Sequence, residues 1–336
     1  MIVRARAPLR VDLAGGWTDV APYAGPRGGV VVNVAVTLYV HAMVETGGEG
    51  VQLHALDLGA HVTARRAADL RPDGELALLK AAARRYALDG SFSLTVRSDA
   101  PPGSGLGGSG ALGVALVAAL TTARGERRLA AEVAADAFEL ERVDAGVMGG
   151  KQDQYAAALG GTQYLAFRDP AVTATRLRLP PAAFRELEQS LVLGYSGATR
   201  FSDATHRRVW QAFEAGDGAV ARALDGIKGC AVAMREALVR GDLGETARLM
   251  NENWRHQQAL AEGMQTETMA TLERAAREAG ADGVKACGAG AGGCLAVLAR
   301  PGRELDVAAA MRAHGATILR ATFDTAGVVT WTPTPR

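Results

Sequence analysis

Residues 101–111 carry the first indication of chemistry in this chain, because five of these eleven residues are glycine and two are serine. The segment follows an alternating run, Phe92–Arg97, that predicts a strand, and it precedes an apolar run, Ala111–Ala123, that predicts a buried helix. A glycine loop before a helix directs unpaired backbone N–H groups, and the positive end of the helix dipole, at one point. Such a point suits an anion, most often a phosphate. The residues expected to bind phosphate are Pro102, Gly103, Ser104, Gly105, Leu106, Gly107, Gly108, Ser109 and Gly110.

The loop also contains the pattern G-x-G-x-x-G twice, which leaves other interpretations open. A dinucleotide site would require an acidic residue about 20 positions further on, at the end of a second strand. Glu126 is near that position but begins a helical segment, so an NAD(P)-dependent oxidoreductase is the weaker interpretation. The plainest alternative is a glycine-rich turn that binds nothing. A Walker-type loop is excluded, because the sequence contains no Gly-x-x-x-x-Gly-Lys-Ser/Thr.

Two acidic residues further along the chain are candidates for phosphoryl-transfer chemistry. Glu141 ends a predicted helix and offers a hard oxygen ligand for a divalent cation, as Ser109 does in the loop. Asp153 begins a short helix, where the helix dipole stabilises a carboxylate anion. Taken alone, the residue types favour a solvated helix end for Glu141 and a helix cap for Asp153.

Two further motifs extend the pattern over nearly the whole chain. Residues 6–19 read Arg-Ala-Pro-Leu-Arg-Val-Asp-Leu-Ala-Gly-Gly-Trp-Thr-Asp, and residues 285–298 contain Lys-Ala-Cys-Gly-Ala-Gly-Ala-Gly-Gly-Cys. With the loop at 101–110, these motifs resemble those of the GHMP small-molecule kinases in order and spacing. The segments Ala14–Asp19 and Gly149–Ala158 resemble the sugar-1-kinase branch, which includes heptose 7-phosphate kinases and L-fucokinases. One residue departs from the family pattern, because Gly108 replaces the first of two adjacent serines.

The resemblance implies ATP and Mg²⁺ as cofactors and assigns roles to individual residues. Asp153 matches the catalytic aspartate that accepts or orients the acceptor hydroxyl, and Arg10 matches the basic residue that stabilises the transferring phosphoryl group. Ser109 and Glu141 match the metal ligands. The expected substrate-binding residues are Gly15, Gly16, Trp17, Thr18, Asp19, Gly150, Lys151, Arg200, Gly288 and Gly290. Trp17 fits either stacking on a sugar or packing in the core. Arg200 follows a turn that suits a sugar phosphate.

The function that the resemblance implies is phosphorylation of the anomeric hydroxyl of a sugar. Heptose 7-phosphate, converted to the 1,7-bisphosphate, is the expected acceptor, and an unphosphorylated sugar such as L-fucose is the alternative. A sensor that binds sugar and nucleotide without catalysis is a weaker interpretation, because Arg10, Ser109, Glu141 and Asp153 are all present.

Strands and helices alternate around these motifs. In the first half, the pattern predicts strands at Val3–Leu13, Gly29–Val44 and Thr162–Phe167 and helices at Glu75–Leu88, Arg128–Val143 and Lys151–Leu159. The second half predicts a strand at Ser190–Gly194, helices over residues 200–279, strands at 283–287 and 294–299, a helix at 304–314 and strands at 317–322 and 327–331. This order fits a split βαβ arrangement with extra helices.

The expected fold class is α+β. The resemblance implies an α/β N-terminal domain, a ferredoxin-like C-terminal domain and an active site between them. Prolines at Asp169-Pro170 and Leu179-Pro-Pro181 place the predicted boundary there, with domains at residues 1–170 and 182–336.

Bulk properties narrow the functional class. The 336 residues are 48% hydrophobic, 22% charged and carry a formal net charge of +1, so no charge excess favours nucleic acid or an anionic membrane. No apolar run reaches the ~18–20 residues that span a bilayer. Three cysteines do not suggest a disulfide framework, so we expect a cytoplasmic protein. Its partners are expected to be the sugar and ATP, and a homodimer stays open.

Overall fold

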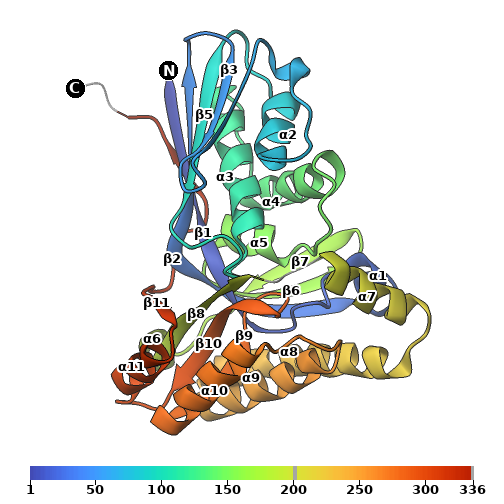
Figure 1. Ribbon diagram of the computed structural model, residues 1–336, viewed down its shortest axis with the longest axis vertical. Helices are drawn as coiled ribbons and strands as arrows, with labels where there is room; N and C mark the ends of the chain where they lie inside the picture. Colours follow the sequence, from blue (N-terminus) through green and yellow to red (C-terminus); the bar gives the residue numbers. More distant parts are fainter. Residues whose placement is uncertain (200–202, 334–336) are drawn as a thin grey trace.

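The computed structural model describes residues 1–199 and 203–333, which form an eight-stranded sheet and a four-stranded sheet with helices packed around them (Figure 1). The first sheet contains β1 (Ile2–Ala14), β2 (Gly29–Thr46), β3 (Val51–Ala55), β4 (Ala60–Ala64), β5 (Phe92–Ser98), β6 (Thr162–Arg168), β7 (Ala171–Arg176) and β12 (Val329–Trp331). The second contains β8 (Leu191–Thr199), β9 (Ala281–Ala286), β10 (Gly292–Ala299) and β11 (Thr317–Leu319). The α-helices are α1 (Ala21–Arg27), α2 (Ala77–Arg85), α3 (Gly108–Ala123), α4 (Ala130–Glu139), α5 (Gln152–Leu159), α6 (Pro181–Ser190), α7 (Asp203–Glu214), α8 (Gly218–Arg240), α9 (Leu243–Gln258), α10 (Glu267–Ala279) and α11 (Glu304–Ala313).

The long strand β2 joins the two parts of the first sheet. Its first half, Gly29–Val34, pairs with β6, and its second half, Val40–Thr46, pairs with β5. Strand β1 lies along the other side of β2 over nearly its whole length. The pairs are antiparallel except for β3 with β5. Because β1 and β2 are continuous, they carry the N-terminal motif from the first sheet toward the second (Figure 1).

Helix α3 packs against β1 and β2 on one side and against α4 and α5 on the other (Figure 1). Nearly all of its residues between Gly110 and Thr121 are buried, which confirms the predicted buried helix. A helix that is apolar all round is stable only when neighbours cover every face. The helix begins at Gly108, three residues earlier than the apolar run predicts, so the end of the glycine loop is its first turn.

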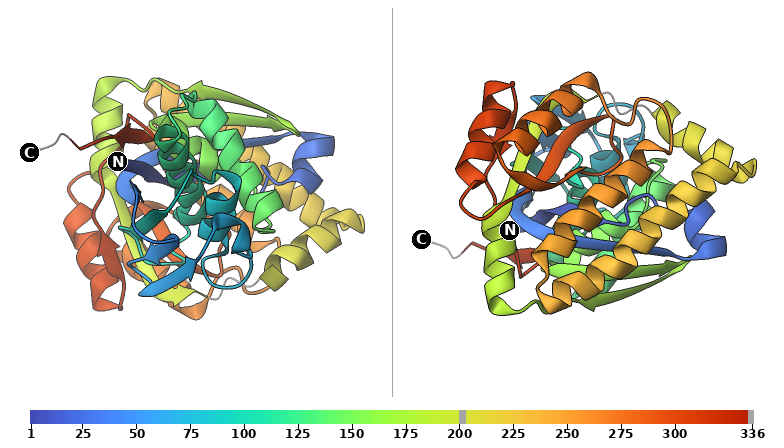
Figure 2. Two further views of the ribbon diagram at one scale, coloured as in Figure 1. Left: turned by 90° about the horizontal axis from the view of Figure 1, so that it is seen from above. Right: turned by 90° about the horizontal axis from the view of Figure 1, so that it is seen from below.

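The second sheet has the strand order β11-β8-β10-β9, and its strand pairs are antiparallel. With helices between β8 and β9 and between β10 and β11, this is the split βαβ arrangement predicted from the sequence. A separate apolar core lies between this sheet and helices α10 and α11. Seen from below, the helices of residues 218–279 cross the lower end of the molecule (Figure 2, right).

Several elements differ from the sequence predictions. Asp169-Pro170 forms the turn of the β6–β7 hairpin, and β12, within the predicted range 182–336, returns to pair with β1 of the first sheet. Strand β1 would otherwise be an edge with unpaired backbone groups. The sequence analysis did not predict β3, β4, β7, α1 or α6, which are short elements. The predicted helix Arg128–Val143 changes into a π turn at Leu140–Asp144.

No helix among the described residues is long and apolar enough to cross a membrane. The cysteines Cys230, Cys287 and Cys294 are free and buried.

Candidate active site

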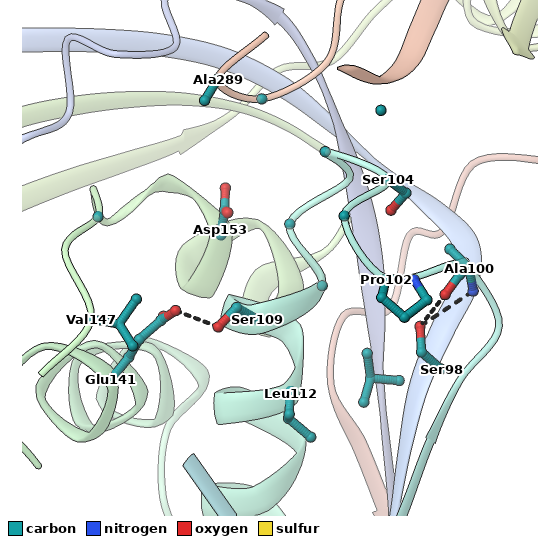
Figure 3. A pocket seen from close by; sticks show the side chains of 18 of the residues that line it. Ser98, Ala100, Pro102, Ser104, Ser109, Leu112, Glu141, Val147, Asp153 and Ala289 are labelled. Carbon is teal, nitrogen blue, oxygen red and sulfur yellow. Dashed lines mark hydrogen bonds between the residues drawn. The ribbon is translucent and has the colours of Figure 1, made fainter. Parts of the chain in front are cut away.

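A cavity of about 580 Å³ lies between the two sheets, where their glycine loops meet (Figure 3). It extends from the π turn and the start of α5 to β3, β5 and α2. Fifteen of the residues selected from the sequence line it: Arg10, Trp17, Asp19, Pro102, Gly103, Ser104, Gly105, Gly107, Gly108, Ser109, Glu141, Gly150, Asp153, Gly288 and Gly290.

The two glycine loops pack backbone against backbone. A Cβ atom on Gly105 would lie 2.6 Å from the carbonyl oxygen of Cys287, and one on Gly293 would lie 2.8 Å from that of Ser104. The N–H of Cys294 donates to the carbonyl oxygen of Ser104 at 2.8 Å. Side chains at Gly105 or Gly293 would separate the loops, and both positions have positive φ values that favour glycine. Each loop therefore fixes the position of the other.

Two residues of the predicted phosphate loop do not line the cavity. Leu106 is fully buried in the core, and its carbonyl oxygen accepts from the N–H of Arg10 at 3.0 Å. Gly110 lies in the first turn of α3, where a Cβ atom would come within 2.5 Å of the Cβ of Asp153. Leu106 and Gly110 therefore help to position Arg10 and Asp153 from the side that faces away from the cavity. The sequence analysis missed this role because a glycine-rich pattern does not tell which residues face inward.

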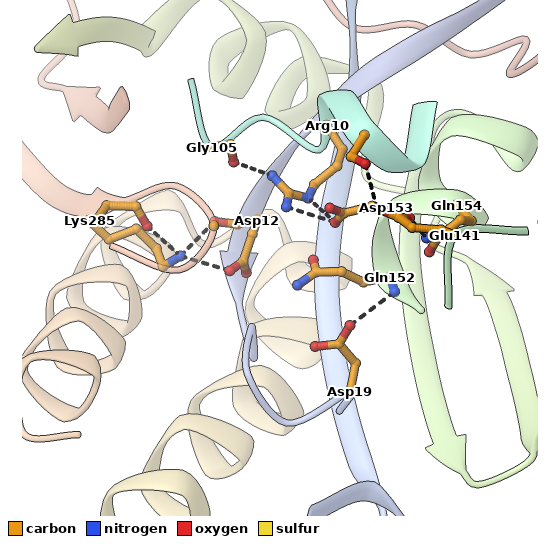
Figure 4. Close-up of polar contacts among 12 residues, drawn as sticks. Arg10, Asp12, Asp19, Gly105, Glu141, Gln152, Asp153, Gln154 and Lys285 are labelled. Atoms are coloured by element: carbon orange, nitrogen blue, oxygen red, sulfur yellow. Dashed lines mark hydrogen bonds and ion pairs between the residues drawn. The ribbon is translucent and has the colours of Figure 1, made fainter. Parts of the chain in front are cut away.

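Arg10 and Asp153 form an ion pair at the centre of the site (Figure 4). The Nε and Nη2 atoms of Arg10 lie 2.8 and 2.7 Å from Oδ1 of Asp153, and Nη1 donates to the carbonyl oxygen of Gly105 at 2.5 Å. The Arg10 side chain is 4% exposed and that of Asp153 is 28% exposed. Among the described residues, no hydrogen bond reaches Oδ2 of Asp153. The pair thus holds the carboxylate in place and leaves one oxygen open to the cavity.

Ser109 and Glu141 lie side by side, as the resemblance implies for metal ligands (Figure 3). The Ser109 hydroxyl donates to Oε1 of Glu141, and the Gln154 amide donates to Oε2 at 2.5 Å. Burial raises the pKa of Glu141, and these two hydrogen bonds act in the opposite direction. A hydroxyl and a carboxylate, both hard oxygen donors, fit Mg²⁺. The π turn positions Glu141, and such turns are frequent at functional sites.

Asp19 lies below Asp153 in Figure 4, next to Gln152. It is 5% exposed, and its Oδ2 accepts from the backbone N–H of Gln152 at 3.0 Å. Burial raises the pKa of Asp19 to about 6. A side chain on Gly150 would overlap the Asp19 carboxylate, so only glycine fits there. The arrangement places a second carboxylate in the same cavity as Asp153.

Trp17 packs in the core, one of the two roles that the sequence left open, and also borders the cavity. Its ring stacks on His206 of α7 at a centroid distance of 4.4 Å and is tilted against Trp210 at 5.7 Å. It belongs to an apolar cluster and is 4% exposed, yet it also lines the cavity. The residue holds a positive φ of 81°, an unusual conformation for a non-glycine side chain.

The structure places four expected substrate residues elsewhere. The buried Thr18 hydroxyl lies 2.8 and 2.9 Å from the carbonyl oxygens of Gly15 and Val30, and the N–H of Gly15 donates to Asn253 of α9. Gly16 packs against Asp12. These residues shape the loop, and they do not line the cavity.

Lys151 is the fourth of these residues. Its ammonium group donates to Oδ1 of Asp169 at 2.6 Å and to the carbonyl oxygen of Pro170 at 2.8 Å, at the β6–β7 turn. This pairing directs the charge of Lys151 to the turn rather than into the cavity. Arg200 lies outside the described residues.

Two features near the site were not predicted from the sequence. The first is the apolar end of the cavity, formed by Val40, Ala55, Leu58, Leu76, Leu78, Leu79 and Val96 from four different elements and loops. The second is a buried ion pair between Lys285 and Asp12 (Figure 4). The sequence signal for it was limited to a lysine and an aspartate within predicted strands.

Comparisons with known proteins agree with this geometry. The sequence matches two family models, GHMP kinases N terminal domain over residues 76–161 and GHMP kinases C terminal over residues 234–317. It is 32% identical over 340 residues to D-glycero-alpha-D-manno-heptose 7-phosphate kinase of Campylobacter jejuni, with 98% of each chain covered. The match to the L-fucokinase/L-fucose-1-P guanylyltransferase of Bacteroides fragilis is 28% identical and covers 89% of this chain but 35% of that protein.

A solved structure gives the same result. The crystal structure of a D-glycero-D-manno-heptose 1-phosphate kinase from Bacteroides thetaiotaomicron superimposes with a TM-score of 0.81 at 30% identity, covering 99% of this chain and 100% of that one. The resemblance and the fold class inferred from the sequence are thereby confirmed. The full-length match to a kinase at 32% identity and the two matching domain models establish that this chain belongs to the GHMP kinase family of phosphotransferases.

Proposed function

We propose that this protein is an ATP- and Mg²⁺-dependent sugar kinase that phosphorylates the anomeric hydroxyl of D-glycero-D-manno-heptose 7-phosphate to give the 1,7-bisphosphate. The observation that carries the proposal is the convergence of Asp153, the Ser109–Glu141 pair and Asp19 on one cavity between two glycine loops. The full-length similarity to the Campylobacter jejuni heptose 7-phosphate kinase supports the choice of acceptor.

The cavity has two chemically different ends, which suit the two parts of ATP. The first turn of α3 directs backbone N–H groups at the phosphates, with the positive end of the helix dipole behind them. The apolar end, with Leu58, Leu76 and Val96, suits the purine base. Ser109 and Glu141 would hold Mg²⁺, which would neutralise the negative charge of the phosphates.

Asp153 is placed to act on the acceptor hydroxyl. Arg10 occupies Oδ1, so Oδ2 is the oxygen that would accept the hydroxyl proton or orient the hydroxyl for attack. Arg10 also brings positive charge next to the transferring phosphoryl group. Catalysis of phosphoryl transfer depends mainly on positioning and charge, so Asp153 needs no unusual proton affinity.

Asp19 is our candidate for recognition of the sugar. A carboxylate accepts two hydroxyl hydrogen bonds from neighbouring ring positions, and Asp19 lies within the same cavity as Asp153. Trp17 and His206 border this end of the cavity and provide ring faces against which a sugar packs. We further propose a cytoplasmic location, where ATP is available and free cysteines are stable.

L-fucose is the second candidate acceptor, because the Bacteroides fragilis protein matches 89% of this chain. The decisive experiment measures ATP-dependent phosphorylation of heptose 7-phosphate, the unphosphorylated heptose and L-fucose, with phosphorus NMR to locate the new phosphate. We expect the highest kcat/KM for heptose 7-phosphate and a new anomeric phosphate. A higher kcat/KM for L-fucose would identify L-fucose as the acceptor instead. No transfer to any sugar in the panel would contradict the proposed function.

A further inference from the structure

A cluster of three side chains on α8 and α9 has the composition of a transition-metal site. It consists of Cys230 on α8 and Glu252 and His256 on α9, and none of the three lines the catalytic cavity. One potential ligand atom from each residue, a sulfur, an oxygen and a nitrogen, lies within 4.8 Å of the other two. The helices pack side by side at the lower end of the molecule (Figure 1).

The local structure explains why the three side chains meet. Glu252 and His256 are four residues apart on α9, so they project from the same face. Cys230 approaches from α8, and Gly226 lies one turn before it. A Cβ atom on Gly226 would lie 2.5 Å from Nε2 of His256, so the glycine provides the space that the imidazole ring occupies. Four residues on two helices thus bring the sulfur, oxygen and nitrogen atoms of the cluster together.

The surroundings hold the cluster while leaving it accessible. Arg248, one turn before Glu252, donates to Oε2 of that carboxylate at 2.5 Å and also pairs with Glu245. One oxygen of Glu252 therefore has a fixed partner, and the other is oriented by it, as outer hydrogen bonds do in metal sites. Cys230 is buried, whereas Glu252 and His256 are partly exposed, so an ion reaches the site from solvent.

We propose that Cys230, Glu252 and His256 bind a divalent transition-metal ion, with Zn²⁺ the best match, and that water completes the coordination. Thiolate and imidazole ligands select Zn²⁺ over Mg²⁺, which prefers oxygen ligands only. On binding, the S–H bond of Cys230 breaks, the proton passes to solvent and a sulfur–zinc bond forms. No redox change or further reactant is involved. The site is separate from the cation site at Ser109 and Glu141.

The position of the cluster on α9 connects it to the substrate loops. Asn253, next to Glu252, accepts a hydrogen bond from the N–H of Gly15 at 2.9 Å. Gln257, next to His256, donates to the carbonyl oxygen of Gly288 at 2.9 Å. A metal ion that joins α8 to α9 would therefore stabilise the helix that holds both loops in place.

Binding of Co²⁺ and Zn²⁺ to the full chain, first stripped with a chelator, tests the proposal directly. We expect Co²⁺ to produce a thiolate-to-metal charge-transfer band in the near ultraviolet, which Zn²⁺ abolishes by displacement, and Zn²⁺ to bind with micromolar or tighter affinity. Cys230→Ala should remove the band, and His256→Gln should weaken Zn²⁺ binding by at least about tenfold. Zn²⁺ should also raise the thermal unfolding midpoint of the wild type more than that of either variant.

Matched variants separate this site from the catalytic one. Cys294→Ala removes another buried cysteine and Glu141→Gln alters the proposed Mg²⁺ site, and both should keep the band and the Zn²⁺ affinity. Circular dichroism and the unfolding midpoint without metal verify that Cys230→Ala and His256→Gln fold. Absence of the band in the folded wild type, or Zn²⁺ binding that is unchanged in both cluster variants, would overturn the proposal.

Discussion

At the scale of single residues, we expect the open oxygen of Asp153 to be the clearest determinant of turnover. Asp153→Asn keeps the shape and one acceptor for Arg10 but removes the negative charge. We expect kcat to fall by about 100-fold or more, the usual range for a positioned acid–base group, while the Kd for ATP changes little. Steady-state kinetics and nucleotide titration measure both. Asp136→Asn, on a carboxylate of α4 outside the cavity, is the control, and equal turnover in the two variants would exclude the proposed role.

Ser109 and Glu141, the proposed Mg²⁺ ligands, give a second prediction at the scale of residues. Ser109→Ala and Glu141→Gln should each raise the Mg²⁺ concentration that gives half-maximal rate, because each removes one hard oxygen ligand or its charge. Rates over a Mg²⁺ titration at saturating ATP measure the effect. Glu139→Gln, two residues before Glu141 and paired with Arg85 at the surface, should leave the titration unchanged. If all three variants titrate like the wild type, the cation binds elsewhere.

Substitution of Asp19 should have opposite effects on stability and on sugar binding. Its pKa is raised from 3.8 to about 6 by burial, so the folded protein retains a proton that the unfolded chain loses at lower pH. The resulting contribution to stability is present below about pH 4 and is lost as the pH rises toward 6. Asp19→Asn should therefore raise the free energy of unfolding at pH 7 by roughly 3 kcal/mol or less. Near pH 4, the two proteins should unfold at similar denaturant concentrations.

The same substitution should impair the enzyme. Without the carboxylate, KM for the sugar is expected to rise at pH 7, and KM of the wild type should rise as the pH falls below about 6. Denaturant unfolding and initial rates across this pH range provide the two measurements. A wild-type KM for the sugar that is constant between pH 5 and 8 would show that Asp19 does not take part in sugar recognition.

At the scale of elements, the Lys285–Asp12 ion pair connects β9 of the second sheet with β1 of the first (Figure 4). Lys285 donates at 3.0 Å to Oδ2 and to the carbonyl oxygen of Asp12 and to the carbonyl oxygen of Ala286, and both side chains are buried. Because Arg10 is two residues before Asp12, the pair helps to hold the part of β1 that carries Arg10.

Removing one partner of this ion pair should lower the free energy of unfolding more than replacing both partners with apolar residues. Lys285→Met leaves a buried carboxylate without its partner and should lower the free energy of unfolding by about 3–5 kcal/mol. The double variant Asp12→Leu/Lys285→Met removes both charges and should recover a large part of that loss. A double-mutant cycle from denaturant unfolding measures the coupling. Additive effects of the two substitutions would show that the pair contributes no specific interaction.

At the scale of the whole molecule, the C-terminal strand ties the end of the chain to the first sheet. Residues Val329–Trp331 pair with Arg4–Arg6, and the N–H of Val328 donates to the carbonyl oxygen of Ala158. Removal of residues 327–336 should expose the edge of β1 and lower the thermal unfolding midpoint by a few degrees. Removal of residues 334–336 alone is the control. An unchanged midpoint in the longer truncation would show that β12 does not stabilise the domain.

Much of the fold was determined by local sequence patterns. The apolar run Ala111–Ala123 predicted the central helix, and strand and helix order predicted the second sheet. These predictions were correct because periodicity records which side of an element is buried. Short elements such as β3, β4 and β7 were missed, because segments of five or six residues carry little periodic signal and are stabilised by their neighbours.

The sequence by itself identified the site motifs, because their order and spacing resemble those of the GHMP kinases. Only the tertiary structure decided which of these residues line the cavity: Asp19 does, whereas Thr18 holds the loop and Lys151 pairs with Asp169. It also brought Asp12 to Lys285 and Cys230 to His256, across 273 and 26 positions of the chain. Side-chain direction and distant pairing depend on packing between elements, and packing is set by the whole fold rather than by neighbouring residues.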